Sequence, residues 1–188
     1  MRIIAGDFRG RRLASVGKGD AGAHLRPTAD RVRESLFNVL SHMDVIGGAH
    51  VLDLFAGTGA LGLEALSRGA ADVTFVENGR VGQGLIRENI RLTQTQDRTR
   101  LITRDATRLG PPDQDPATLV FLDPPYGKGM GERAVLSAGA SGWFAPQALI
   151  VWEEAAPVEA PDGFRLEDRR RYGATHVTLL RFADVTGL

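Results

Sequence analysis

Apolar positions from residue 50 onward alternate between short continuous runs and longer segments with helical spacing. The short runs are long enough for buried strands and occur at residues 51–55, 73–76, 101–102, 119–122 and 149–152. The segments after the first, second and fourth runs repeat apolar residues every three or four positions, which predicts amphipathic helices. This alternation predicts an α/β fold with a mostly parallel sheet and helices on both faces. Two last runs, separated by Gly173, predict an antiparallel hairpin at residues 164–172 and 175–182.

Residues 1–46 follow a different pattern, and we separate them as an N-terminal extension from a main domain at residues 47–188. Two short apolar stretches around a Gly-containing turn predict a small β-hairpin within residues 2–13. A Gly-rich loop follows, and then a helix that begins with Thr28 or Asp30 as its N-cap. The chain has no net charge, but its first 40 residues carry eight basic and four acidic side chains. This excess of basic residues indicates either a basic arm on a neutral or acidic body or a solvated charged extension.

Composition excludes several classes of site. The chain has 188 residues and no cysteine, which excludes disulfides and cysteine-ligated zinc. The four histidines are scattered without metal-ligand spacing, so we expect no metal site. No segment approaches the ~20 apolar residues of a membrane helix, and the N-terminus does not resemble a signal peptide. We therefore expect a cytoplasmic protein without membrane contact.

Each of the first four predicted strands has an acidic residue at a comparable place: Asp53 lies in the first strand, and Glu77, Asp105 and Asp123 follow the next three. In a parallel sheet these positions meet at the ligand-binding edge. The loop after the first strand contains Ala56, Gly57, Thr58 and Gly59 and has the form G-x-G-x-x-G, whose glycines let the backbone approach a ligand. Glu77 lies 20 residues beyond Gly57, the spacing of a ribose-binding acid in nicotinamide enzymes. The glycine motif by itself therefore leaves a dinucleotide-dependent dehydrogenase open.

The acidic residues favour S-adenosylmethionine over a dinucleotide as the cofactor. Asp53 can hold the cationic amino acid portion of adenosylmethionine, whereas the same carboxylate would repel a pyrophosphate. Glu77 is placed for the ribose hydroxyls and Asp105 for the adenine amine, and we include the neighbouring Asn78 and Ala106 in the expected cofactor site. In this loop the sequence resembles the glycine loop of class I methyltransferases.

The four residues after the fourth predicted strand form the predicted catalytic loop: Asp123, Pro124, Pro125 and Tyr126. An exocyclic base amine is a poor nucleophile because its lone pair is delocalised into the ring. The Asp123 carboxylate and the Pro124 carbonyl can accept both N–H hydrogens of such an amine, and the prolines make the loop rigid. Tyr126 offers a flat face on which a displaced base can stack. The loop leaves adenine N6, cytosine N4, guanine N2 and a protein glutamine amide open as methyl acceptors, so a feature outside the motif must select among them.

Taken together, the motifs resemble the bacterial RsmD family over nearly the whole chain. The likeness rests on residues 2–6, 8–11, 25–28, 30–34, 36–38, 55–69 and 123–126. It implies a Rossmann-like class I methyltransferase with a seven-stranded sheet, an antiparallel last strand and an N-terminal hairpin that helps to grip RNA. It also implies methylation of one guanine N2 in 16S ribosomal RNA, within an assembled or partly assembled 30S particle. Because the net charge is zero, we expect modest affinity for RNA alone, with ribosomal proteins supplying part of the docking surface. We also expect a monomer.

The residues predicted to contact RNA are Arg9, Arg11, Arg12, Arg26 and Lys128. Arg31 and Arg33 are either further contacts or helix-surface residues paired with acids such as Glu34. The chain departs from the family pattern in a long Gly-rich segment at residues 15–24 and in a basic run at residues 169–171.

Three other functions stay open at this point. A DNA or other RNA base-amine methyltransferase would use the same loop, although 188 residues leave little room for a separate target-recognition region. A nicotinamide-dependent oxidoreductase would leave Asp53 and the Asp123–Tyr126 loop without a role. A non-enzymatic ribosome assembly factor would use the same fold only to bind RNA.

Overall fold

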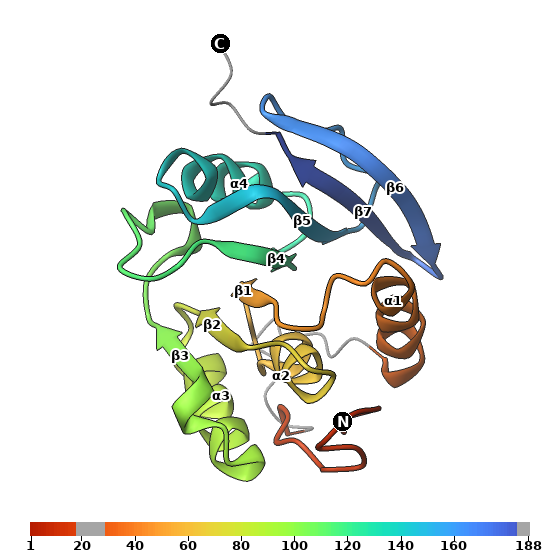
Figure 1. Ribbon diagram of the computed structural model, residues 1–188, viewed down its shortest axis with the longest axis vertical. Helices are drawn as coiled ribbons and strands as arrows, with labels where there is room; N and C mark the ends of the chain where they lie inside the picture. Colours follow the sequence, from red (N-terminus) through yellow and green to blue (C-terminus); the bar gives the residue numbers. More distant parts are fainter. Residues whose placement is uncertain (18–28, 184–188) are drawn as a thin grey trace.

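Seven strands form one sheet in the computed structural model, which describes residues 1–17 and 29–183. The sheet order is β3-β2-β1-β4-β5-β7-β6, which Figure 1 shows from lower left to upper right. The strands are β1 (His50–Leu54), β2 (Asp72–Val76), β3 (Thr99–Ile102), β4 (Ala117–Leu122), β5 (Phe144–Glu154), β6 (Phe164–Tyr172) and β7 (Thr175–Phe182). Strands β1 to β5 pair in parallel, whereas β7 is antiparallel to both β5 and β6. The predicted mostly parallel sheet with an antiparallel last strand is confirmed.

Helices cover both faces of this sheet (Figure 1). Helices α1 (Asp30–His42), α2 (Ala60–Ser67) and α3 (Arg80–Thr93) pack on one face, and α4 (Met130–Ala140) packs on the other. Two short 3₁₀ helices, η1 (Gln96–Arg98) and η2 (Ala106–Arg108), flank β3. Alternate residues of β4 enter the two cores: Phe121 contributes to the α1–α2 side and Leu122 to the α4 side, both fully buried. A strand buried on both faces reads as a continuous apolar run, which is why the sequence predicts it well.

The first 13 residues double back on themselves, as expected, but they do not form two strands. Their reversal is held by Ile3, whose N–H donates to the Arg11 carbonyl at 2.9 Å, and by one isolated antiparallel bridge between Arg2 and Arg12. The predicted β-hairpin is therefore wrong in detail. Neighbouring backbone N–H groups donate instead to α2, because Glu64 accepts from both Ile4 and Ala5 at 2.9 and 3.1 Å.

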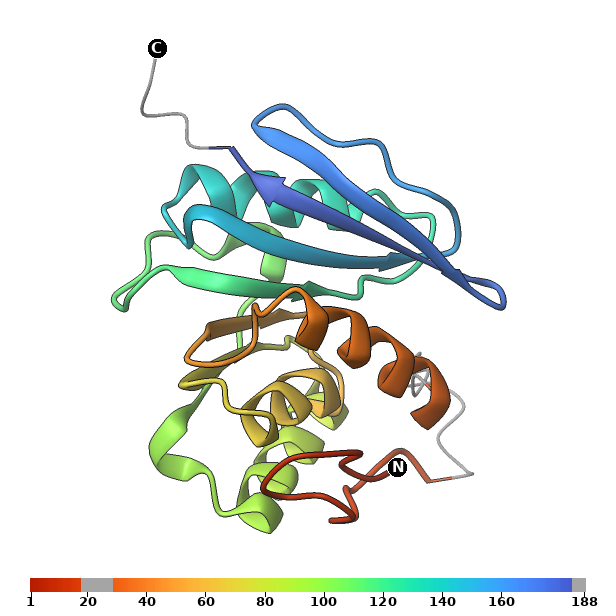
Figure 2. The same ribbon diagram turned by 45° about the vertical axis from the view of Figure 1, so that its right-hand side comes forward.

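This N-terminal segment lies against α2 and α3 (Figure 2). Asn89 of α3 accepts a hydrogen bond from the Ala14 N–H at 2.7 Å and donates to the Thr58 carbonyl at 2.8 Å. Ile3 and Leu13 are buried in the same core as Leu36 of α1. Asn89 therefore connects the N-terminal segment to Thr58 of the glycine loop. The segment also shares a hydrophobic core with the main sheet.

The N-cap of α1 is Ala29, and Asp30 is the first helical residue, so the predicted capping role of Asp30 is wrong. Its carboxylate pairs with Arg33 at 2.8 Å instead. Thr28, the other predicted cap, lies outside the described residues. Within the part of the chain that the structure describes, no helix is long and apolar enough to cross a membrane.

Gly62 allows α2 to approach the sheet closely. A Cβ atom at this position would come within 2.5 Å of Phe75 Cε1 and 2.7 Å of Val73 Cγ1. We expect Gly62→Ala to lower the free energy of unfolding by about 1–3 kcal/mol, because the added methyl group overpacks the interface. Urea denaturation measures this change.

A glycine in α3 supplies the matched control. A Cβ atom at Gly84 would meet nothing within 4 Å. We expect Gly84→Ala to raise the free energy of unfolding by about 0.5–1 kcal/mol, because alanine is the better helix former. Gly62→Ala with wild-type stability would contradict the close packing of α2 on β1 and β2.

Candidate active site

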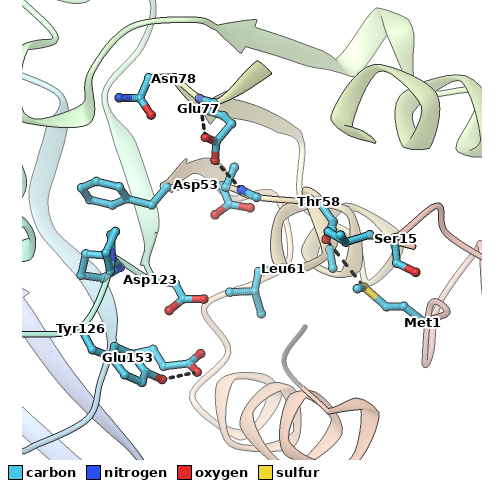
Figure 3. Close-up of a pocket in the computed structure, with 18 of the residues that line it drawn as sticks. Met1, Ser15, Asp53, Thr58, Leu61, Glu77, Asn78, Asp123, Tyr126 and Glu153 are labelled. Carbon is cyan, nitrogen blue, oxygen red and sulfur yellow. Dashed lines mark hydrogen bonds between the residues drawn. The ribbon is translucent and has the colours of Figure 1, made fainter. Parts of the chain in front are cut away.

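A cavity of about 440 Å³ lies beyond the carboxyl ends of β1, β2, β4 and β5 (Figure 3). Ten of the residues predicted from the sequence line it: Asp53, Ala56, Gly57, Thr58, Glu77, Asn78, Asp123, Pro124, Pro125 and Tyr126. The structure thus brings the predicted catalytic loop and most of the predicted cofactor residues to one site. Its volume is in the range of small-molecule sites, which are ~300–1,000 Å³.

The glycine loop between β1 and α2 is held by two carboxylates. Gly57 and Gly59 have φ angles of 59° and 77°, a left-handed conformation that glycine adopts without strain. Glu77 accepts the Gly57 N–H at 2.8 Å, and Asp53 accepts the Gly62 N–H at 3.0 Å. The two acids that the sequence assigns to the cofactor therefore also fix the backbone around which it would bind.

Phe55 has a φ angle of 57°, in the same left-handed region, although it carries a side chain. Such a conformation costs a non-glycine residue on the order of 1–2 kcal/mol. Its side chain lines the cavity, beside the loop that follows β1. Strain of this kind persists where the surrounding structure fixes it, often at ligand sites.

Asp53 is a buried acid with an unusual charge state. Its side chain is about 1% exposed, and burial raises its pKa to about 8, with a further contribution from the charge of Glu77. The Gly62 N–H opposes this shift by hydrogen bonding to the carboxylate. A cationic ligand would favour the ionised form, because an opposite charge nearby lowers an acid's pKa. The carboxylates of Asp53 and Glu77 around this cavity therefore fit a cationic nucleoside such as adenosylmethionine.

Asp123 faces the cavity from the end of β4, next to a residue that the sequence analysis missed. Leu122 of β4 pairs with Trp152 of β5 in the parallel register. The next residues along the two strands, Asp123 and Glu153, therefore lie side by side. Burial raises the pKa of Asp123 well above its usual value, and the charges of Glu153 and Asp53 add to this shift. Tyr126 donates its hydroxyl hydrogen to Glu153 Oε1 at 3.3 Å. A signal for Glu153 existed in the sequence, because it too is an acid at the end of an apolar strand.

Three predicted cofactor residues do not line the cavity: Gly59, Asp105 and Ala106. Asp105 is the N-cap of η2, where its Oδ1 accepts the N–H and the hydroxyl of Thr107, both at 2.8 Å. These hydrogen bonds lower the pKa of Asp105. Ala106 is buried in the core beneath α4. Contact between Asp105 and adenine stays a prediction.

The predicted RNA-contacting residues in the described part of the chain are exposed, namely Arg9, Arg11, Arg12 and Lys128. Arg11 donates to the Leu92 carbonyl at 2.8 Å, which holds its side chain over the end of α3. Arg26 lies outside the described residues.

The predicted surface position of Arg33 is wrong, because the residue is completely buried and lines the cavity, whereas the predicted pairing with an acid of the same helix is confirmed. Its Nη2 donates to the Arg2 carbonyl at 2.6 Å and to Asp30, rather than to Glu34. Burial lowers the pKa of this guanidinium, opposed by the charges of Glu64 and Asp30. Arg33 therefore links α1 to the N-terminal segment through its hydrogen bond to the Arg2 carbonyl, and the local sequence does not predict this role.

A parallel sheet with an antiparallel last strand, a glycine loop after β1 and acids at successive strand ends define the class I adenosylmethionine-dependent methyltransferases. Residues 1–181 match the model of the family described as conserved hypothetical protein 95. The chain belongs to this family, the RsmD family of methyltransferases.

Individual relatives agree with this assignment. The chain is 43% identical over 154 residues to ribosomal RNA small subunit methyltransferase D of Escherichia coli, covering 81% of this chain and 74% of that protein. It is 36% identical over 178 residues to the protein of the same name from Haemophilus influenzae, covering 92% and 89%. A solved structure of a putative methyltransferase from Escherichia coli superimposes with a TM-score of 0.81 at 36% identity, covering 97% and 98% of the two chains.

Proposed function

We propose that the protein transfers the methyl group of S-adenosylmethionine to the N2 amine of one guanine in 16S ribosomal RNA. The observation that carries this proposal is the position of Asp123 on a proline-rich loop, in the same cavity as Asp53 and Glu77. The family resemblance supports guanine N2 as the acceptor, and relatives named ribosomal RNA small subunit methyltransferase D support ribosomal RNA as the substrate.

In this reaction the chain's residues act mainly by placing the amine. Adenosylmethionine, when bound, supplies a methyl group on a positively charged sulfur. Asp123 and the Pro124 carbonyl accept the two N–H hydrogens, so that the nitrogen lone pair points toward the methyl carbon. The ring of Tyr126 stacks on the base. The N2 lone pair forms the new bond to carbon, the old carbon–sulfur bond breaks toward sulfur, and the surplus N2 proton passes to the Asp123 carboxylate.

The raised pKa of Asp123 suits this last step. A carboxylate with a raised pKa holds a proton more readily than an ordinary aspartate does. Because Glu153 and Asp53 contribute to the shift, the basicity of Asp123 depends on both neighbouring strands.

The proposed substrate is an assembled or partly assembled 30S particle in the cytoplasm, and the enzyme acts as a monomer. The chain carries no net charge, so phosphate attraction alone gives modest affinity for RNA. Ribosomal proteins would supply the rest of the docking surface, and the exposed arginines of the N-terminal segment would contact the RNA backbone.

Methyl transfer to under-methylated 30S particles tests this function. We expect incorporation of labelled methyl groups, with N2-methylguanosine as the product in nucleoside mass spectrometry. Protein-free 16S RNA, assayed in parallel, should accept less label. N6-methyladenosine as the product would indicate a different substrate, and absence of transfer to any 16S-containing particle would contradict the proposal. Thermal stabilisation by NAD, without stabilisation by S-adenosylhomocysteine, would indicate an oxidoreductase.

A further inference from the structure

The Asp123–Tyr126 loop does not by itself distinguish guanine from adenine or cytosine, since all three bases carry a conjugated NH₂ group. The bases differ at the ring nitrogen beside that amine. In guanine this nitrogen, N1, carries a hydrogen, whereas the corresponding adenine N1 and cytosine N3 carry a lone pair. A hydrogen-bond acceptor placed next to Asp123 would therefore meet a donor only in guanine.

Glu153 occupies that position. It follows Trp152, the register partner of Leu122, so its backbone lies one strand away from that of Asp123. Adjacent strands are about 4.8 Å apart. The carboxylates of Asp123 and Glu153 both point into the cavity (Figure 3).

The surroundings of Glu153 keep its carboxylate in place. The residue is about 8% exposed and follows four buried apolar residues of β5 at 149–152. The Tyr126 hydroxyl donates to its Oε1, which links Glu153 to the ring proposed to stack on the base. Two neighbouring carboxylates in a cavity repel each other, and each further hydrogen-bond donor that reaches them reduces this cost. The N1–H and N2–H groups of guanine are such donors, and they lie on the same edge of the base.

We propose that Glu153 accepts the N1–H of the target guanine while Asp123 accepts an N2–H, so that Glu153 selects guanine over adenine and cytosine. This inference rests on the proposed function at guanine N2. With adenine or cytosine in the cavity, the Glu153 carboxylate faces a ring lone pair instead of a hydrogen. A site built around a hydrogen bond rejects analogues that lack the matching group, and here the carboxylate would face a lone pair of the base.

The base 2-aminopurine tests this contact, because it keeps the N2 amine of guanine but has a lone pair at N1. It also lacks O6, so the comparison with a Glu153 variant assigns the effect to this residue. The wild-type enzyme first locates its target nucleotide in 30S particles. Particles are then reconstituted on ligated 16S RNA that carries either guanine or 2-aminopurine at that nucleotide. We expect the wild-type enzyme to prefer guanine by at least about tenfold in kcat/KM.

Glu153→Gln should reduce this preference at least about fivefold, because the glutamine amide can donate a hydrogen bond to N1 of 2-aminopurine. Glu154→Gln is the matched control: Glu154 is the next residue of β5, does not line the cavity and accepts the Ala155 N–H at 2.9 Å. The control should keep the wild-type preference. Both variants should bind S-adenosylhomocysteine as the wild type does, which shows that the fold and the cofactor half are intact.

Two results would overturn the role of Glu153. One is a Glu153→Gln enzyme with the wild-type ratio of guanine to 2-aminopurine methylation. The other is a wild-type enzyme that methylates the two bases equally, a result that needs no variant. Either leaves guanine methylation itself standing, whereas a wild-type enzyme that forms no N2-methylguanosine removes the proposed function together with this inference.

Discussion

We expect Asp123→Ala to lower the rate constant for methyl transfer to 30S particles by about 10³-fold, the effect of losing a preorganised group that acts in the transition state. The variant loses an acceptor that orients the base amine and takes its proton. The Pro124 carbonyl is retained, but one acceptor cannot align the amine hydrogens in the same way. Single-turnover kinetics with labelled adenosylmethionine measures the effect without a contribution from product release.

Asp123→Asn separates charge from shape at this position. The asparagine side chain has nearly the same volume. Its NH₂ group is a hydrogen-bond donor that cannot accept the N–H of the base amine, and the amide cannot take up the proton. We therefore expect a loss of at least about 10²-fold. Affinity for S-adenosylhomocysteine should stay near the wild-type value in both variants. More than a tenth of wild-type activity in Asp123→Ala would contradict the proposed role of the loop.

The wild-type rate should also rise with pH as Asp123 ionises. Burial and the charge of Glu153 raise the pKa of this carboxylate, so the ionised form needed to accept hydrogens is lost at a higher pH than for an ordinary aspartate. Removing the neighbouring charge by Glu153→Gln should shift the pH–rate profile toward lower pH.

Affinity for S-adenosylhomocysteine should increase from about pH 6 to about pH 7.5, and Asp53→Asn should remove this increase. Burial raises the pKa of Asp53 to about 8, so most of this group is protonated in the ligand-free protein over that range. The cationic amine of the ligand favours the ionised carboxylate, and binding therefore releases a proton. Proton release on binding makes affinity rise with pH, by at most tenfold per pH unit for one group.

The Asp53→Asn variant should bind S-adenosylhomocysteine about 10²-fold more weakly than wild type near pH 8, the effect expected for loss of a buried charge partner. The difference should shrink toward pH 6, where protonated Asp53 resembles asparagine. Isothermal titration calorimetry in buffers of different ionisation enthalpy measures both the affinity and the proton release. Asp115→Asn, an exposed carboxylate outside the cavity, is the control and should keep the wild-type profile. Equal pH dependence in Asp53→Asn and wild type would contradict this assignment.

The same shift has a consequence for stability without ligand. The folded pKa of Asp53 is above its unfolded value, so between about pH 4 and about pH 8 the folded state holds a proton that the unfolded state has released. The contribution of Asp53 to the free energy of unfolding therefore falls as pH rises through this window. Asp53→Asn should show a smaller decline than wild type over the same range.

The sequence by itself determined the alternation of strands and helices and the position of the chemistry along the chain. Buried parallel strands such as β4 are continuous apolar runs, so their ends are visible in the sequence, and Asp53 and Asp123 stand at those ends. The glycine loop and the double proline of the catalytic loop are local features, because glycine permits positive φ angles and proline fixes φ whatever their surroundings. These features sufficed to predict the fold class and ten of the twenty residues that line the cavity.

Only the tertiary structure decided which residues from distant parts of the chain meet. Glu153 lies beside Asp123 because β5 pairs with β4 in one particular register, and Arg33 contacts the N-terminal segment through the Arg2 carbonyl, about 30 residues away in sequence. The predicted hairpin does not form two strands, because the N–H groups of Ile4 and Ala5 donate to Glu64, which is about 60 residues away in sequence. Strand register and long-range hydrogen bonds arise from packing between segments, and local hydrophobic spacing contains no information about which segments those are.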